Sequence, residues 1–306
     1  MNIAIIGSGA MGSLFGGFLE KTTTPTLYDL NTRHIQAIQK NGLIMQFPDA
    51  TRTVPVRATD QAESIGAMDA VILFVKHPFT EQALLDGLKS AITPDTLVIS
   101  LQNGLGNADI MARHLAPDQI VYGLSTLTSD IAAPGHIHVT CSLELPTLMW
   151  PLNNAPCEKL QALCTRMNQA GLNTTLSPSV ETDIWMKLLV NASLNSLCAI
   201  TRKTVGGVVN HAGTRELLHQ IVYETADVAQ AKGLPISRQA AIEHVLHVAE
   251  NTMSHVPSMA IDIMNQKPTE IEAINGAIVR EGERLHIPTP ATRYAAELVR
   301  CLEYPA

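Results

Sequence analysis

The sequence predicts an α/β protein with an N-terminal Rossmann-type, doubly wound parallel sheet and a C-terminal all-helical domain. Three observations predict it: a glycine-rich turn between an apolar strand and a helix, further continuous apolar runs, and a change near residue 177 to long segments of helical periodicity. We therefore expect two domains, residues 1–177 and residues 178–306.

The glycine-rich turn directly follows the apolar run Asn2–Ile6 and opens a segment, Ser13–Glu20, that can form a helix. In such a G-x-G-x-x-G turn the first glycine permits the tight bend, the second lets backbone approach a pyrophosphate, and the third lets helix and strand pack closely. The unpaired N–H groups and the positive end of the helix dipole then face the phosphates. The expected cofactor-binding residues of this turn are Gly7, Ser8, Gly9, Ala10, Met11 and Gly12.

Three further runs, 26–29, 70–75 and 96–101, are predicted strands of the same sheet, and the last two are continuously apolar, as in strands covered on both faces. Each run ends at polar residues: Asp29, Lys76, and Gln102-Asn103-Gly104. Ligands bind at the carboxyl ends of parallel strands. An acid about 20 residues beyond the first glycine is also placed to accept a hydrogen bond from a ribose hydroxyl.

Between residues 120 and 150 short alternating pieces, such as 136–140, favour antiparallel strands. Ser177 and Pro178 then have the pattern of an N-cap followed by proline at the first helical position. The domain boundary is placed here, with residues 1–177 binding the dinucleotide and residues 178–306 forming a helical substrate and catalytic domain.

Composition excludes several classes of protein. The 306 residues are 46% hydrophobic, enough for two well-buried cores. A formal charge of −7, from 21 basic and 28 acidic residues, disfavours nucleic acid and anionic membranes as partners. The five cysteines, which form no C-x-x-C pair, indicate reduced thiols. No signal peptide pattern and no bilayer-spanning apolar run is recognised, so we expect a soluble cytoplasmic protein.

One polar stripe interrupts the strongly apolar segment 184–195. Lys187, Asn191 and Asn195 are spaced i, i+4 and i+8, which places them along one face of a helix at about 100° per residue. Buried polar groups need partners, since an unpaired one costs about 1–3 kcal/mol. Alternatively, Lys187 pairs with Asp183 one turn earlier on a solvated face, and the asparagines only line that face.

A second region with candidate site residues contains Ser258 and, further on, Thr269 and Glu270. Thr269 and Glu272 satisfy the capping-box pattern, which predicts a helix starting at Thr269. Glu270 would then stand in the first helical turn, where a carboxylate can also act only by complementing the helix dipole.

Taken together, the motifs resemble the ketopantoate reductases (2-dehydropantoate 2-reductases) in both halves of the chain and in the same order. Besides the glycine turn, the matching motifs are Gln102-Asn103-Gly104, Trp185-x-Lys187-Leu188-x-x-Asn191-x-x-x-Asn195, Ser258-Met259-x-x-Asp262, Thr269-Glu270-Ile271 and Asn275-Gly276.

The resemblance implies an enzyme that transfers a hydride between a nicotinamide cofactor and C2 of a 2-oxo acid. By motif position, Lys187 would be the general acid, and Glu270 would bind substrate or orient the lysine. Asn191, Asn195 and Ser258 would hold the substrate, and Asn103 would lie beside both the nicotinamide ribose and the substrate. The expected partners are a small-molecule 2-oxo acid and, in a homodimer, a second copy of the chain.

The sequence departs from the family pattern at the cofactor. Family members typically carry an arginine after the second strand to bind the 2′-phosphate of NADP, and here Leu30 follows Asp29. A carboxylate suits a ribose diol and repels a phosphate, which favours NAD(H). Lys76 favours NADP(H), the family default, because the family uses a lysine at that strand end, and Arg33 could also approach the phosphate. Asp29 and Lys76 are both assigned to cofactor binding.

Two alternative functions follow from these features. The same departure occurs in relatives that act as NAD-dependent D-2-hydroxyacid dehydrogenases on branched or aromatic 2-oxo acids. A noncatalytic dinucleotide-binding sensor is the reading from another class, and Lys187 and Glu270 at family spacing argue against it. No metal site is expected, because His244 with His247 and His136 with His138 lack the spacing and third ligand of zinc sites.

Overall fold

The computed structural model describes residues 1–87, 90–140, 142 and 144–303. The chain divides into two units: Met1–Gln102 with Asn107–Val180, and Asn103–Gly106 with Glu181–Ala306. Residues 103–106, which follow a strand of the first unit, thus belong with the helical second unit.

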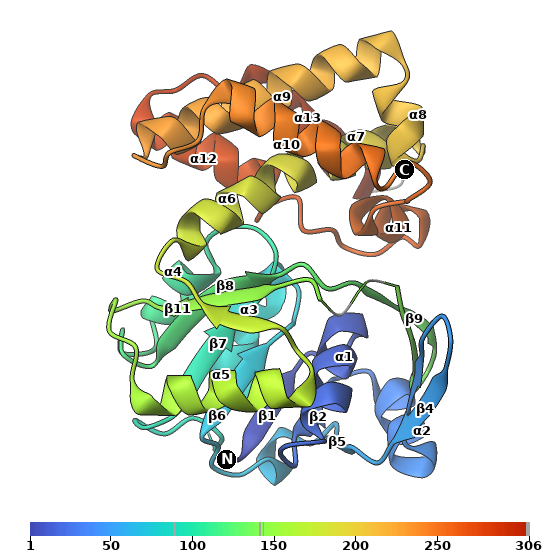
Figure 1. Cartoon of the computed structure of the whole chain (residues 1–306), viewed down its shortest axis with the longest axis vertical. Helices are drawn as coiled ribbons and strands as arrows, with labels where there is room; N and C mark the ends of the chain where they lie inside the picture. Colours follow the sequence, from blue (N-terminus) through green and yellow to red (C-terminus); the bar gives the residue numbers. More distant parts are fainter. Residues whose placement is uncertain (88–89, 141, 143, 304–306) are drawn as a thin grey trace. The chain divides into compact units, whose positions relative to one another are not determined.

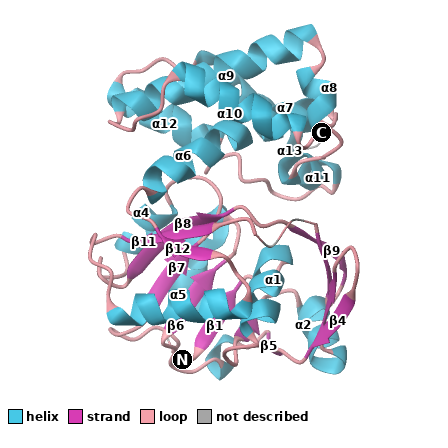
Figure 2. Ribbon diagram, viewed as in Figure 1, coloured by secondary structure: helices cyan, strands magenta, loops and turns pink. Residues whose placement is uncertain are grey.

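An eight-stranded sheet forms the centre of the first unit (Figure 2). Its strand order is β12-β11-β8-β7-β6-β1-β2-β5, and all neighbours are parallel except β8 and β11. The strands are β1 (Ile3–Ile6), β2 (Thr26–Tyr28), β5 (Arg57–Thr59), β6 (Ala70–Leu73), β7 (Leu97–Ser100), β8 (Ile120–Ser125), β11 (Thr147–Pro151) and β12 (Thr174–Leu176). The order reverses between β1 and β6, and this is where open parallel sheets bind their ligands.

Helices cover the sheet on both faces, so the predicted fold class is confirmed. The alternating residues of β1 show this: Ile3 and Ile5 pack in one apolar cluster, and Ala4 and Ile6 pack in another. The helices of this unit are α1 (Ala10–Leu19), α2 (Thr32–Asn41), α3 (Thr80–Gln82), α4 (Asn107–Ala112) and α5 (Glu158–Ala170), with 3₁₀ turns at Ala62–Ser64 and His77–Phe79 and a π-helical turn at Ala83–Gly87.

A second, four-stranded sheet in this unit has the order β4-β3-β10-β9 and lies beside α1 and α2 (Figure 1). Its strands are β3 (Leu43–Gln46), β4 (Thr51–Val54), β9 (Ser129–Ala133) and β10 (His136–Val139). The antiparallel pairing expected around residues 136–140 is found between β9 and β10, whereas β10 pairs in parallel with β3.

The second unit consists of helices and connecting loops, with no strand among its described residues. Its elements are α6 (Val180–Val190), a π-helical turn (Asn191–Asn195), α7 (Ser196–Thr201), α8 (Val205–Val209), α9 (Ala212–Ala231), α10 (Arg238–Glu250), α11 (Ser258–Met264), α12 (Asn275–Leu285) and α13 (Pro290–Glu303). Helix α6 starts two residues later than the Ser177-Pro178 pattern predicts, because Ser177 and Pro178 precede it in a turn.

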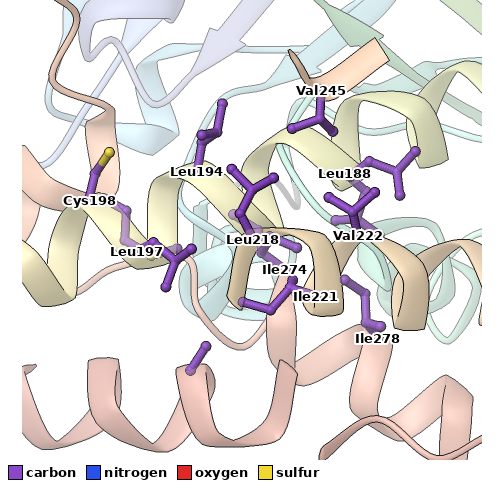
Figure 3. Close-up of a cluster of buried hydrophobic side chains, with 14 of the residues drawn as sticks. Leu188, Leu194, Leu197, Cys198, Leu218, Ile221, Val222, Val245, Ile274 and Ile278 are labelled. Carbon is purple, nitrogen blue, oxygen red and sulfur yellow. The ribbon is translucent and has the colours of Figure 1, made fainter. Parts of the chain in front are cut away.

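The core of the helical unit surrounds the continuous helical stretch from α6 to α7. Figure 3 shows Leu188, Leu194 and Leu197 of this stretch among side chains of α9, such as Val222, and of α12, such as Ile278. The stretch Val180–Thr201 is long and apolar enough to cross a membrane by length and composition, but 67% of its most apolar window is buried inside the protein. Such burial is that of a core helix.

The cysteines whose structure is described are all free thiols: Cys157, Cys164, Cys198 and Cys301. Cys141, also predicted to be reduced, lies outside the described residues.

Candidate active site

The glycine turn connects β1 to α1, and each of its three glycines stands in a different environment. Gly7 has φ +87°, and a Cβ there would lie 2.6 Å from the backbone nitrogen of Val75, just beyond β6. A Cβ on Gly12 would lie 2.1 Å from the carbonyl oxygen of Gly7. A Cβ on Gly9 would meet nothing within 4 Å. The first and third glycines are thus required by packing, and the second leaves open space where a ligand can approach.

Ser8 stands between Gly7 and Gly9 in this turn. The residue is fully buried, and its hydroxyl oxygen has no hydrogen-bond partner in the structure. A buried hydroxyl without a partner is costly unless a ligand or water satisfies it. The turn also leads into α1, a ten-residue helix with Gly9 at its N-cap, so its free N–H groups are available to an anion. Ser8, Gly9 and the start of α1 therefore fit the pyrophosphate of a dinucleotide.

Behind the turn, a buried histidine holds the backbone in place. His34 Nδ1 accepts from the Gly135 N–H, so its Nε2 carries the proton and donates to Ser13 Oγ (3.1 Å). Ser13 Oγ in turn donates to the Ser8 carbonyl (2.8 Å). Burial lowers the pKa of His34, although Asp29 acts in the opposite direction. His34 thus supports the turn as a neutral imidazole.

Asp29 follows β2, and its Oδ1 accepts from the Asn31 N–H (2.9 Å) at the start of α2. Leu30, where the family pattern has an arginine, is 75% exposed. Arg33 is exposed as well, and Lys76 is half-buried beyond β6, the strand next to β1. The sequence-predicted cofactor residues of this unit therefore all lie at the carboxyl ends of β1, β2 and β6.

In the helical unit, Lys187 lies in the last turn of α6, flanked by the buried core residue Leu188. Burial lowers the pKa of Lys187 to about 8, because the charged ammonium loses solvation, and the negative charge of Glu270 opposes this shift. The lysine therefore titrates close to neutral pH, which a proton donor requires.

Glu270 is also held by Asn103. Asn103 Nδ2 donates to Glu270 Oε2 (3.0 Å), although the two residues are 167 positions apart. Gly104, with φ +81°, lies so close to Ala273 that a Cβ would be 2.3 Å from the Ala273 carbonyl oxygen, and the Leu105 N–H donates to that same oxygen (2.8 Å). The segment after β7 is thus fastened to the segment that carries Glu270.

Asn191 and Asn195 stand at the two ends of a π-helical turn rather than on a regular α-helix. Their side chains meet, with Asn195 Nδ2 donating to Asn191 Oδ1 (3.3 Å). Single π turns inside α-helices occur frequently at functional sites. The predicted polar stripe is therefore present, but its spacing is set by a π turn that the sequence pattern does not reveal.

The helix predicted to start at Thr269 is wrong, since residues 270–274 form a turn and α12 starts at Asn275. Thr269 Oγ1 accepts from the Ile271 N–H (3.1 Å), and Glu272, the expected partner in the capping box, binds Arg300 instead. The proposal that Glu270 only complements the dipole of that helix therefore loses its structural basis.

Ser258 is exposed and is the first residue of α11, a helix that packs against the π turn. Among the described residues, no group of three or more His, Cys, Asp or Glu side chains could hold a metal ion.

Two residues with clear structural roles near these sites received none from the sequence. His34 is one, and Gln102 is the other: its amide donates to the Val75 carbonyl (2.7 Å) and to Thr80 Oγ1 (2.8 Å), which fixes the loop that carries Lys76. Gln102 lies in the motif Gln102-Asn103-Gly104 at the end of a predicted strand, a position that indicates such a role. Nothing in the local sequence distinguishes His34 from an ordinary helical histidine.

Comparisons with known proteins show the family to which this chain belongs. Two family models match the chain: ketopantoate reductase PanE/ApbA over residues 3–145, and ketopantoate reductase PanE/ApbA C terminal over residues 179–303. A 2-dehydropantoate 2-reductase of Streptococcus pyogenes serotype M3 is 34% identical over 307 residues, covering 99% of this chain and 98% of the relative. A 2-dehydropantoate 2-reductase of Halobacterium salinarum is 30% identical and covers 98% of each chain.

Solved structures are similar over the same length. D-mandelate dehydrogenase, determined with NADH and anilino(oxo)acetate, has a TM-score of 0.90 at 30% identity and covers 99% of this chain and 98% of its own. The 2-dehydropantoate 2-reductase of Geobacter metallireducens has a TM-score of 0.91 at 26% identity, covering 98% of this chain and 99% of its own. The chain therefore belongs to the ketopantoate reductase family of nicotinamide-dependent enzymes and is an oxidoreductase of that kind.

Proposed function

We propose that this protein reduces C2 of a small 2-oxo acid to the D-2-hydroxy acid, with NADH as the hydride donor. Residues 1–177 bind the dinucleotide, and residues 178–306 bind the substrate and supply the catalytic groups. The observation that carries this proposal is the cluster of Lys187, Glu270 and Asn103, in which a half-buried lysine that feels the charge of a carboxylate has a pKa of about 8. A proton donor with such a pKa is what reduction of a carbonyl requires.

Lys187 is the general acid in this mechanism. A nicotinamide cofactor held by the Gly7–Gly12 turn would supply the hydride for C2, and the carbonyl oxygen of the substrate would then accumulate negative charge. The Lys187 ammonium stabilises that charge and gives its proton to the oxygen, which becomes the hydroxyl group. Because the negative charge appears only as the hydride arrives, this interaction acts on the transition state more than on the ground state.

Glu270 keeps Lys187 protonated and orients it, since its negative charge raises the pKa that burial lowers. Asn191, Asn195 and Ser258 are proposed to bind the polar groups of the substrate. Asn103 is proposed to contact both the substrate and the nicotinamide ribose, with its amide oriented by Glu270.

The preference for NADH rests on Asp29 and Leu30. The Asp29 carboxylate at the end of β2 suits the two ribose hydroxyls and repels a 2′-phosphate. Leu30 is exposed and offers the phosphate no hydrogen-bond donor. Lys76 and Arg33 are the cations that would favour NADPH instead, so the two cofactors must be compared directly.

A second candidate function has specific support. The pairing of Asp29 with Leu30, together with the similarity to D-mandelate dehydrogenase in its NADH complex, favours an NAD-dependent D-2-hydroxyacid dehydrogenase of branched or aromatic 2-oxo acids. The third candidate, a noncatalytic sensor, is not supported, because the chain belongs to a family of oxidoreductases.

A homodimer and a cytoplasmic location stay predictions, and one solved relative is described as a dimeric ketopantoate reductase.

Steady-state rates with ketopantoate, 2-oxoisocaproate and phenylpyruvate, each with NADH and with NADPH, test these proposals. The highest kcat/KM with ketopantoate supports a ketopantoate reductase, and the highest value with either of the other acids supports the dehydrogenase. No turnover of any of the three acids with either cofactor would overturn both.

A further inference from the structure

Two side chains donate hydrogen bonds to a backbone carbonyl within the π turn at Asn191–Asn195. The Ser196 N–H, at the end of the turn, donates to the Ser193 carbonyl. The Ala192 carbonyl receives two side-chain donors, the Ser196 hydroxyl and Asn275 Nδ2, the latter at 3.0 Å. A π turn shifts the regular i→i−4 bonding of a helix, so such side-chain donors fix where it sits.

Asn275 reaches this carbonyl from a segment 83 positions away. The residue is fully buried, and its Oδ1 has no hydrogen-bond partner in the structure. Because only the amide nitrogen has a partner, the bond to Ala192 sets the orientation of the side chain. The orphaned oxygen also means that Asn275 does not gain the full stabilisation that its amide could supply.

Backbone hydrogen bonds also link the segment before Asn275 to Glu270. The Ala273 and Ile274 N–H groups both donate to the Glu270 carbonyl (3.0 and 3.1 Å), which makes residues 270–274 a closed turn leading directly into Asn275. On the other side of the same region, Ile274 and Ile278 pack in the core cluster with Leu188 and Leu194 (Figure 3). The turn that carries Glu270 and the helix that carries Lys187 therefore share one apolar core and the Asn275–Ala192 bond.

We propose that Asn275 is a positioning residue: its bond to the Ala192 carbonyl fixes the π turn that presents Asn191 and Asn195, and holds the turn that carries Glu270 in register with Lys187. The role deepens the proposed function and rests on it. Asn275 need not contact substrate, since it acts through the placement of the residues that do.

The test replaces Asn275 with Ala, and with Asp, whose ionised carboxylate keeps the shape but cannot donate to Ala192. Both variants should lower kcat/KM for the 2-oxo acid at least 10-fold and leave the dissociation constant for NADH within twofold of wild type. If the turn that carries Glu270 is no longer held in place, the negative charge of Glu270 should raise the pKa of Lys187 less than in the wild type. The fall of activity at alkaline pH should therefore move to lower pH by half a unit or more.

Thr225→Val is the matched control for a merely structural effect. Thr225 is also fully buried in the helical unit, and it donates one hydrogen bond to a helix carbonyl, that of Ile221 (2.8 Å). This variant should lower Tm but keep kcat/KM within twofold and leave the pH profile unchanged. Should Asn275→Ala fail to fold, Asn275→Ser introduces a shorter hydroxyl, and it should show the same loss of kcat/KM and the same shift.

A folded Asn275→Ala enzyme with kcat/KM within twofold of wild type and an unchanged pH profile would overturn the proposal. If the wild type turns over none of the tested 2-oxo acids, the proposed function fails. The positioning role can then be tested separately by measuring the pKa of Lys187 in a ¹³C NMR titration of labelled lysines. The Lys187→Arg variant identifies the Lys187 signal. A lower Lys187 pKa in Asn275→Ala supports the positioning role, and an unchanged pKa overturns it.

Discussion

Asn103 donates its side-chain amide to the carboxylate of Glu270, although these residues are 167 positions apart in the chain. The preceding residue, Gln102, is fixed within the Rossmann unit by its bonds to Val75 and Thr80. Two adjacent side chains are thus anchored in different units. Within the helical unit, Asn103 thus donates an amide to the carboxylate whose negative charge raises the pKa of Lys187.

Replacing Lys187 with Ala should abolish turnover and leave dinucleotide binding nearly unchanged, because the lysine lies in the helical unit and not in the glycine turn. General acid catalysis contributes about 10²- to 10⁴-fold to the rate, so kcat should fall by about 100-fold or more. Stopped-flow single turnover and NADH titration measure the two quantities. Lys232→Ala is the control, since Lys232 pairs with Glu181 and Glu281 instead. A Lys187→Ala enzyme with more than a third of wild-type kcat would disprove the assignment.

The pH dependence of reduction should report the pKa of Lys187. A general acid must be protonated, so kcat/KM should be constant at low pH and fall as pH rises through about 8. Glu270→Gln removes the negative charge that raises this pKa, and the fall should therefore begin at lower pH. The amide oxygen of the glutamine can still accept from Asn103. A normal kcat/KM profile with Tm lowered by several degrees would instead assign Glu270 a structural role.

Replacing Gly9 with Ala and replacing Gly12 with Ala should have different effects. A Cβ on Gly9 meets open space, so Gly9→Ala should fold normally but weaken dinucleotide binding by occupying the place of the pyrophosphate. A Cβ on Gly12 would lie 2.1 Å from the Gly7 carbonyl oxygen, so Gly12→Ala should lower the stability of the protein. Thermal unfolding and fluorescence titration with NADH separate the two effects. Unchanged NADH affinity in Gly9→Ala would exclude this turn as the pyrophosphate site.

NADH should be preferred over NADPH in kcat/KM by about 10- to 100-fold, because the Asp29 charge faces the 2′-phosphate. Asp29→Asn should narrow the preference while keeping an acceptor for the Asn31 N–H, and Asp29→Ala should narrow it without that acceptor. Adding Leu30→Arg should reverse the cofactor preference, because the arginine guanidinium group can donate two hydrogen bonds to the 2′-phosphate. Equal or better wild-type efficiency with NADPH would mean that Lys76 or Arg33 neutralises the phosphate.

The stability of the Rossmann unit should fall as pH drops below about 6.5. Burial lowers the pKa of His34 in the folded protein. At pH values between this lowered pKa and the ordinary pKa of histidine, the unfolded chain therefore binds more protons than the folded protein does, and acidification favours unfolding. Protonation would also break the bond from the Gly135 N–H to Nδ1. Denaturant unfolding from pH 7 to 5 should show a shallower slope for His34→Gln than for wild type. Equal slopes for wild type and His34→Gln would contradict the prediction.

Local patterns were enough to predict the Rossmann core. The glycine turn and the apolar runs that became β1, β6 and β7 were recognisable because short-range rules, such as backbone freedom at glycine and burial on both faces, fix those elements. The polar residues at the strand ends followed from the same rules. Lys187, Asn191 and Asn195 were visible as polar positions in an apolar helix, and motif spacing brought in Glu270 and Asn103.

Tertiary structure decided what depends on distant partners. Residue alternation predicts a strand at 136–139 but not its neighbours, and only folding paired β10 in parallel with β3. The capping box at Thr269 did not form, and Glu272 instead forms an ion pair with Arg300 of α13. The π turn likewise depends on Asn275, 83 residues beyond Ala192. The sequence by itself determined which side chains could do the chemistry, and the tertiary structure determined their distances and the pKa of Lys187, because burial and long-range hydrogen bonds exist only in the folded chain.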